Sequence, residues 1–207
     1  MRTIQSLPKT ILLVLLIGVA FTSCSKSDNG KGNEEEPETA AGADHSFDVT
    51  LVNKADAADA VEYKGALPSD EARAIYRNRT ISGETEHSIT MVFGKLEEVG
   101  SIYGNFDLDD DDQPFTELGA YHLVDGGTLE IRPEGTVDLY TSVSGTLTFS
   151  GLQYALPTAS VGAAAYTLKF EGDFEKRTSG TKSDDTYHGS GTFVISPQDD
   201  MGTYKTP

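Results

Sequence analysis

The chain of 207 residues has a single cysteine, Cys24. A disulfide needs two cysteines, so no bridge can form within the chain and the fold must be stabilised by its core alone. Many small exported domains depend on disulfides instead of a large core. A domain of about 160 residues can bury roughly two-thirds of the surface of its unfolded chain, which is enough for a fold without disulfides.

Tryptophan is absent, and basic residues are few. Sixteen Lys and Arg residues stand against 33 Asp and Glu residues, which gives a formal net charge of −17. Nucleic acids and anionic lipid headgroups are bound through Lys and Arg, so we expect neither nucleic acid nor a basic membrane-binding face. An acidic surface mainly keeps a protein soluble. Nine Tyr and nine Phe residues remain to build a core.

The longest apolar run spans residues 11–21, ILLVLLIGVAF. A helix that crosses a bilayer needs about 20 apolar residues, so this run is too short for an uncleaved membrane anchor. Arg2 and Lys9 precede it, without any acidic residue. A short apolar run behind a positively charged segment is typical of a secretory signal peptide.

Thr22, Ser23 and Cys24 follow this run, and they resemble the lipobox of bacterial lipoprotein precursors. Phe21 departs from the usual Leu, as in the looser lipoboxes of Bacteroidota. The resemblance implies an outer-membrane lipoprotein in which residues 1–23 are removed, Cys24 carries a diacylglycerol, and the new amino terminus is acylated, for example by palmitate. The alternative is an ordinary signal peptide with a cysteine at the cleavage site by chance.

Residues 25–44, SKSDNGKGNEEEPETAAGAD, have no apolar periodicity and are rich in Gly, Ser, Asn, Glu and Pro. This composition predicts a disordered tether between Cys24 and a folded domain, with an r.m.s. span of roughly 25 Å. Acidic residues that follow the lipidated cysteine resemble a surface-export signal of Bacteroidota lipoproteins. The resemblance implies display on the cell surface, and an outer-membrane protein that faces the periplasm is the alternative.

From residue 45 to residue 207 the apolar residues recur with period two, which predicts half-buried strands. In YTLKFEGDFEK, for example, Tyr166, Leu168, Phe170 and Phe174 share one face, with Gly172 marking a bulge or a close backbone approach. About nine or ten such segments, often 8 to 12 residues apart, predict an all-β domain with an antiparallel β-sandwich or β-barrel fold. One short helix is expected near residues 69–78, because Ser69 can cap it. The hairpins of the second half also resemble those of small uncharacterised Bacteroidota lipoproteins.

One acidic segment, DLDDDDQPF, is a candidate for metal binding. Asp107, Asp109 and Asp111 have the spacing of a calcium loop, in which carboxylate oxygens surround the ion. The segment has Asp112 where such loops have Gly and Leu118 where they have a bidentate Glu. An acidic loop between two strands is therefore the alternative to a calcium site, and we expect no other cofactor.

No catalytic motif is present. His45, His87, His122 and His188 lack the spacing of a zinc pair, and the chain contains no Gly-x-Ser-x-Gly nucleophile motif. We therefore expect a non-enzymatic, lipid-anchored envelope protein that binds a partner or belongs to an assembly. Its contact with the membrane would be the lipid on Cys24, and its protein or glycan partner stays open. The alternatives are a lipocalin-like barrel with a small apolar ligand and an envelope hydrolase.

Overall fold

The structure is a computed structural model that describes residues 45–81, 83–95, 98, 100–120, 125–158 and 160–207. These residues form ten strands and one short 3₁₀ turn, η1. Their bounds are β1 (His45–Asn53), β2 (Ala60–Leu67), β3 (Ala72–Ile81), β4 (Glu84–Phe93), β5 (Ser101–Asp107), β6 (Glu117–Gly119), β7 (Gly127–Arg132), β8 (Asp138–Ala155), β9 (Val161–Thr178), β10 (Thr181–Ile195) and η1 (Asp199–Met201).

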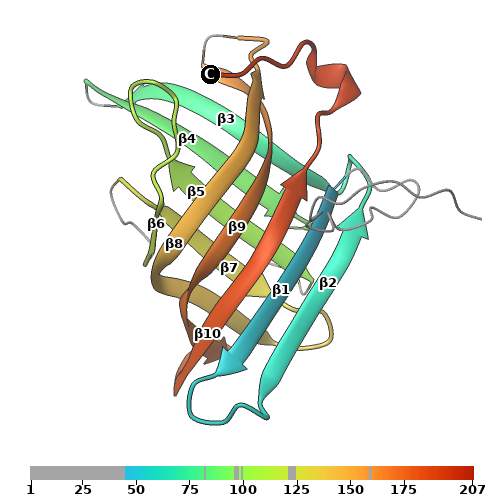
Figure 1. Cartoon of the computed structure of the whole chain (residues 1–207), viewed down its shortest axis with the longest axis vertical. Coiled ribbons are helices and arrows are strands. Elements are labelled where there is room, and N and C mark those ends of the chain that lie inside the picture. The colour runs from blue at the N-terminus through green and yellow to red at the C-terminus, as the bar shows by residue number, and fades with distance from the viewer. Residues whose placement is uncertain (1–44, 82, 96–97, 99, 121–124, 159) are drawn as a thin grey trace, which may run out of the picture. The chain divides into compact units, whose positions relative to one another are not determined.

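The strands form one sheet in which six strands close on themselves. The hydrogen-bonded order runs β3-β4-β5-β7-β8-β9, and β9 returns to β3 through the pairing of Val161–Ala163 with Ile75–Arg77. Closure of a sheet into a barrel removes its free edges. Three further strands extend the sheet from β9 in the order β10-β1-β2, so β2 is an edge strand among the described strands (Figure 1). The prediction of an all-β antiparallel fold is confirmed.

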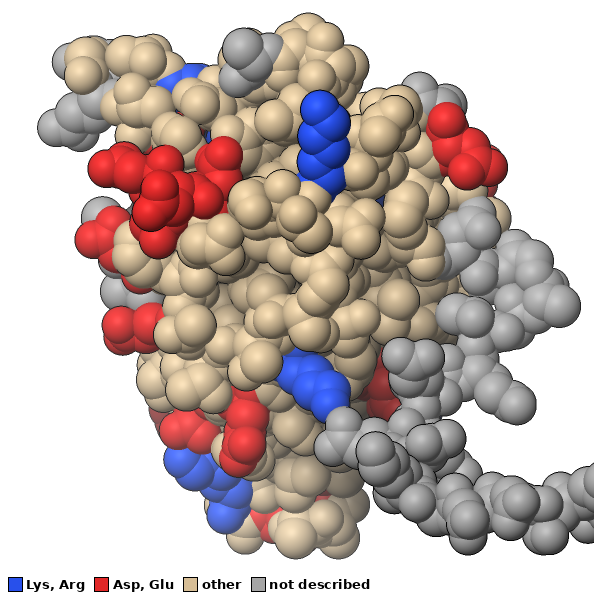
Figure 2. Space-filling model, turned by 45° about the horizontal axis from the view of Figure 1, so that its top comes forward, with Lys and Arg blue, Asp and Glu red and all other residues tan. Residues whose placement is uncertain are grey.

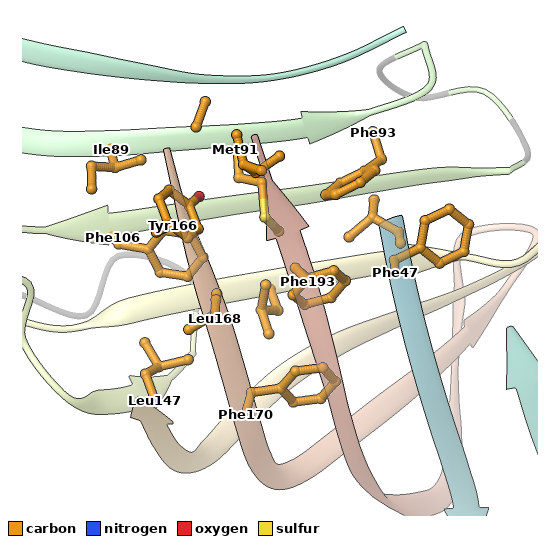
Figure 3. Close-up of a cluster of buried hydrophobic side chains, with 14 of the residues drawn as sticks. Phe47, Ile89, Met91, Phe93, Phe106, Leu147, Tyr166, Leu168, Phe170 and Phe193 are labelled. Carbon is orange, nitrogen blue, oxygen red and sulfur yellow. The ribbon is translucent and has the colours of Figure 1, made fainter. Parts of the chain in front are cut away.

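Alternation of side chains produces this arrangement. Along β1 every second residue is buried, including Phe47, Val49 and Leu51. The inward residues of the strands form one core, in which Phe193 contacts Phe93 and stacks on Phe170 with ring centroids 5.8 Å and 5.4 Å apart (Figure 3). Burial of each such ring stabilises the fold by roughly 1.5–3 kcal/mol relative to its exposure. The enclosed space is therefore filled by side chains at these positions.

The helix expected near residues 69–78 is wrong, because this segment leads into a strand. Ala72–Ile81 is β3, and it pairs with β4 over its whole length. Ala72, Ala74 and Tyr76 are buried on its inner face. Their period of two follows the sheet, and long-range pairing with β4 outweighs the local capping signal of Ser69.

Gly172 marks a close approach of two strands, as its place on an apolar face predicts. It pairs with Gly145 of β8 and with Gly189 of β10, so three glycines lie in one row across the sheet. A side chain at position 172 would collide with the carbonyl oxygen of Ser144 and lie 3.0 Å from the Cα of Gly145. Glycine is thus required where β8, after a bulge, approaches β9.

The other segment predictions have mixed outcomes. The segment GTLEIRPEGTVDLY predicts a hairpin that turns at Pro133–Gly135, and β7 and β8 form this hairpin, with Gly135 at a φ of +78°. The segment GAYHLVDGG, residues 119–127, also predicts a strand, but its residues 121–124 lie outside the described residues. The predicted signal peptide, Cys24 and the predicted tether also lie outside them. No helix among the described residues is long and apolar enough to cross a membrane.

Candidate functional site

The acidic loop between β5 and β6 is closed by one of its own carboxylates. Asp109 Oδ1 accepts hydrogen bonds from the backbone N–H groups of Asp111 and Gln113, at 2.9 Å and 2.8 Å. Short bonds of this kind, from a side chain to the backbone two residues ahead, stabilise a tight turn. A backbone bridge between Leu108 and Pro114 closes the base of the loop. The Asp109 carboxylate therefore acts as a structural acceptor within its own loop.

Asp112 connects this loop to the sheet. Its Oδ1 accepts a hydrogen bond from the Tyr76 hydroxyl at 2.9 Å and lies 2.8 Å from Nδ1 of His87. The Tyr154 hydroxyl donates to the backbone oxygen of Asp112 at 2.8 Å. Tyr76, His87, Asp112 and Tyr154, which come from β3, β4, the loop and β8, are called the Asp112 cluster. Asp112 has a φ of +59°, a left-handed conformation that Asp tolerates better than most residues.

The electrostatics of the Asp112 cluster keep its tyrosines neutral. Burial, assisted by the hydrogen bond to Asp112, raises the pKa of Tyr76 to about 12. Burial also raises the pKa of Tyr154. A carboxylate only accepts hydrogen bonds, so Nδ1 of His87 carries a proton, and Nε2 is the acceptor in the neutral ring. His87 and Asp112 could serve as an oriented base, but such catalysis also needs a nucleophile within hydrogen-bond reach. The hydrogen bonds of the Asp112 cluster connect the loop to β3, β4 and β8.

The three predicted calcium ligands do not gather around one point. Asp107 Oδ2 lies 3.5 Å from the backbone nitrogen of Gly126, and burial raises the pKa of this carboxyl group. Asp109 closes the loop, and Asp111 is exposed. Among the residues that the structure describes, no three His, Cys, Asp or Glu side chains are grouped as a metal site. Calcium binding stays a prediction without support from this arrangement.

A second polar group lies at the opposite end of β8 and β9. Lys176 Nζ is 3.0 Å from Asp138 Oδ2 and 5.8 Å from the ring centroids of both Tyr140 and Tyr187. The Tyr187 hydroxyl donates to Asp59 Oδ2 at 2.6 Å. Lys176, Asp138, Tyr140, Tyr187 and Asp59 are called the Lys176 cluster. It combines an ion pair with cation–π contacts.

The charges of the Lys176 cluster compensate one another. The hydrogen bond between Lys176 and Asp138 raises the pKa of Lys176, so its ammonium group stays protonated. Hydrogen bonds from Tyr187 and then Asn53 lower the pKa of Asp59. The side chains of Lys176 and Asp138 are only 20% and 17% exposed. The cation is thus already balanced by the protein's own carboxylates, and the cluster contributes to the fold at this end of the barrel.

The histidines are separated. His188 lies on the outer face of the sheet, with Nε2 3.4 Å from Glu171 and Nδ1 3.5 Å from Asp173. His45 is buried, and its Nδ1 accepts a hydrogen bond from the backbone of Ser196. His122 lies outside the described residues, as does Cys24, the predicted lipidation site. No described pair of histidines therefore supports a zinc site.

The Asp112 and Lys176 clusters were not predicted from the sequence, although the alternation of inward and outward residues places one member of each cluster on an inward face. His87 shares the inward parity of Ile89 and Met91 along β4, and Lys176 shares that of Phe174 along β9. A polar residue at an inward position near the end of a strand needs partners. The partners Asp112 and Asp59 belong to loops, whose position the strand pattern does not predict.

Comparisons with protein-family models, with curated proteins and with solved structures found no match to this chain.

Proposed function

We propose that this protein is a lipid-anchored lipoprotein of the bacterial outer membrane, and that its β domain is a non-enzymatic binding or assembly module. The proposal rests first on the residues Phe21–Cys24 and the acidic segment that follows them, which resemble a lipobox and an export signal. A lipid on Cys24 would hold the domain at the membrane, because two or more acyl chains give stable anchoring.

The observation that supports a non-enzymatic role is that the polar side chains at both ends of the barrel form hydrogen bonds and ion pairs with one another. In the Asp112 cluster, the carboxylate holds Tyr76 and His87. In the Lys176 cluster, Asp138 and Asp59 balance the cation and hold Tyr187. These groups satisfy one another and fix loops to strands. Polar groups that bond to one another in this way form a structural network, whereas groups that bind a substrate have to be available to it.

The alternatives have less support. In a lipocalin-like barrel an apolar ligand occupies the interior, but the rings of Phe93, Phe193 and Phe170 contact one another there. A hydrolase requires a nucleophile beside a base or two carboxylates across a cleft, and the contacts described above include neither arrangement. We therefore retain the binding or assembly role.

The experiment that tests the anchor is metabolic labelling with a fatty-acid analogue. Cells that express the parent chain should incorporate the label into this protein, and the Cys24→Ala variant should lose it. Ser23→Ala is the matched control, because it keeps a small residue before the cysteine and should remain labelled. Label that persists in Cys24→Ala would contradict the proposal.

A second experiment distinguishes display on the cell surface from a position on the periplasmic face of the outer membrane. Protease added to intact cells should cleave the tether between Cys24 and His45 and release the β domain if the protein is displayed outside. Permeabilised cells provide the control for susceptibility of the tether. A chain that is cleaved only after permeabilisation would favour the periplasm-facing alternative.

A further inference from the structure

The edge strand β2 presents a regular set of backbone groups that no described strand uses. Among the described strands it pairs with β1 alone, in a register that places Val52 opposite Ala60 and Thr50 opposite Glu62. The backbone N–H of Asn53 donates to the backbone oxygen of Asp59 at 2.9 Å. This bond fixes which positions of the ladder are hydrogen-bonded pairs, because such pairs alternate along an antiparallel ladder.

This alternation determines which backbone groups of β2 face β1 and which face the free edge. The odd residues from 59 to 67 direct their backbone groups toward β1. The four even residues, Ala60, Glu62, Lys64 and Ala66, direct their N–H and C=O groups toward the free edge. The side chains of these four residues are all exposed on the outer face of the sheet. An edge strand with open backbone groups can pair with another chain.

We propose that β2 is a self-association edge, at which two copies of this chain pair antiparallel about a two-fold axis through Tyr63. In this register Glu62 lies opposite Lys64 of the second copy, and Ala60 lies opposite Ala66. All four outward residues then form hydrogen-bonded pairs. The symmetry generates each contact twice, as in an isologous dimer.

The charges on β2 select this register over its neighbours. A shift that centres the axis on Glu62 places two glutamates opposite each other, and a shift that centres it on Lys64 does the same for two lysines. Like charges directly opposite destabilise a strand pair, whereas opposite charges stabilise it. Lys64 Nζ also lies 3.4 Å from Asp48 Oδ2 of β1, and this ion pair holds the Lys64 side chain on the outer face of the sheet. Charged residues on edge strands usually prevent pairing, but here they are self-complementary.

The inner face of β2 is fixed against its own domain, which prepares the edge for pairing. The ring of Tyr63 packs against Phe47 with centroids 4.6 Å apart, and its hydroxyl donates to the backbone oxygen of Gly100 at 2.7 Å. Val61 and Leu67 also pack against the core. The strand is therefore held in extended form before association, so pairing costs little additional backbone entropy.

The test is disulfide cross-linking of the full-length chain in intact cells, with non-reducing gels as the readout. Residues of a hydrogen-bonded pair have Cα atoms about 5.5 Å apart, within the range that a disulfide spans. The double variant Glu62→Cys/Lys64→Cys should give a covalent dimer. The parent chain, which carries Cys24 alone, gives the background.

The single variants test the register. In the proposed pairing, position 62 of one copy is offset from position 62 of the other by two residues, about 6.8 Å along the strand, and this places the two positions beyond disulfide reach. Glu62→Cys and Lys64→Cys alone should therefore cross-link much less than the double variant. A single variant that cross-links as well as the double would overturn the register. A double variant that stays at background would overturn the edge itself.

Charge exchange provides a second measurement that uses no new cysteine. Glu62→Lys or Lys64→Glu should weaken association roughly tenfold, because two cross-strand pairs become repulsive. The double exchange Glu62→Lys/Lys64→Glu should restore it. The dimer fraction is read by native mass spectrometry of the detergent-extracted chain, and Asp184→Lys, an exposed charge change on β10, is the control. If the double exchange fails to restore a dimer that the single exchanges disrupt, the proposed opposition of Glu62 and Lys64 is wrong.

A loss of monomer stability is measured separately from a loss of pairing. Lys64→Glu and the double exchange both place a glutamate at position 64, beside Asp48. Thermal melting monitored by circular dichroism verifies that each variant is folded. The inference goes beyond the lipid-anchored role and does not depend on it, since labelling of Cys24 and cross-linking at β2 are separate readouts.

Discussion

At the scale of single residues, the buried tyrosines differ in the partners of their hydroxyl groups. Tyr76 and Tyr154 donate to Asp112, and Tyr187 donates to Asp59. The Tyr166 hydroxyl is buried and has no hydrogen-bond partner among the described residues. A buried polar group without a partner costs free energy, whereas a satisfied one contributes to stability. Removal of an oxygen atom should therefore have opposite effects at these positions.

Tyr166→Phe should leave the free energy of unfolding unchanged or raise it by about 1 kcal/mol, because the variant no longer buries an unsatisfied hydroxyl. The ring contacts of Tyr166 with Phe149 are kept. Chemical denaturation of the parent and variant chains measures the difference. A loss of more than about 1 kcal/mol would show that the hydroxyl group has a stabilising partner.

Asp112→Ala should lower the free energy of unfolding by about 1–3 kcal/mol, because it leaves Tyr76 and His87 without their acceptor. Asp112→Asn is the matched control. It keeps an oxygen acceptor for Tyr76 and a residue type that tolerates positive φ, so its loss should be smaller. Equal losses in urea denaturation would mean that the carboxylate oxygen does not hold the loop to the strands.

The acid sensitivity of the fold should depend on Tyr187. The hydrogen bond from Tyr187 is the largest cause of the lowered pKa of Asp59. A lowered pKa in the folded state means that this stabilisation is fully present above the unfolded value of 3.8 and is lost as the pH falls through the folded value. Tyr187→Phe should therefore lose less stability than the parent between pH 7 and pH 3.

Urea denaturation at the two pH values measures this difference, and Tyr166→Phe is the control because its hydroxyl has no described carboxylate partner. The control should show the pH dependence of the parent. An unchanged pH dependence in Tyr187→Phe would contradict the assigned cause of the Asp59 shift.

At the scale of the elements, the period-two pattern predicted the strands, and glycine positions controlled where they approach each other. Gly172 faces the backbone of β8 directly. Gly135, by contrast, lies in a turn with open space around the position of a side chain. The two residues therefore separate a steric requirement for glycine from a conformational one.

Gly172→Ala should lower the free energy of unfolding by about 3 kcal/mol, the upper end of the cost of overpacking, because the backbone of β8 has to move. Gly135→Ala should cost about 1 kcal/mol, since only its left-handed conformation opposes a side chain. Thermal or chemical unfolding of the two variants provides the comparison. A smaller loss for Gly172→Ala than for Gly135→Ala would contradict the close approach of β8 and β9.

Much of the fold could be predicted from the sequence because alternation is a local property. The inward positions of β1, β4, β9 and β10 follow directly from it. The segment of β3 was misjudged because the capping signal at Ser69 is local, whereas its pairing with β4 and β9 is not. The closure of β9 onto β3 and the continuous length of β8 also depend on register between distant segments, which single-sequence patterns do not contain.

The candidate site was less predictable for the same reason. The spacing of Asp107, Asp109 and Asp111 suggested a shared ligand, but folding gave each carboxylate a different neighbour. The carboxylate that joins the loop to the sheet is that of Asp112, which stands where a calcium loop has Gly. Its partners Tyr76 and His87 come from β3 and β4 and meet it only after the sheet has closed.

At the scale of the whole molecule, the chain is strongly acidic, with a formal net charge of −17. Figure 2 shows acidic side chains mostly toward the margins of the view, with a broad, mostly uncharged area between them in which a few basic side chains lie. On the outer faces of β8 and β9, Thr148 pairs with Lys169 and Ser150 pairs with Thr167. An excess of acidic charge favours solubility of the folded domain.

We propose that a lipid on Cys24 holds this domain at the outer membrane. Mass spectrometry of the amino-terminal peptide from the native protein tests it most directly. The account predicts a peptide that begins at Cys24 and carries the mass of a diacylglyceryl group and an additional acyl chain. An unmodified thiol at Cys24, with or without removal of residues 1–23, would contradict it.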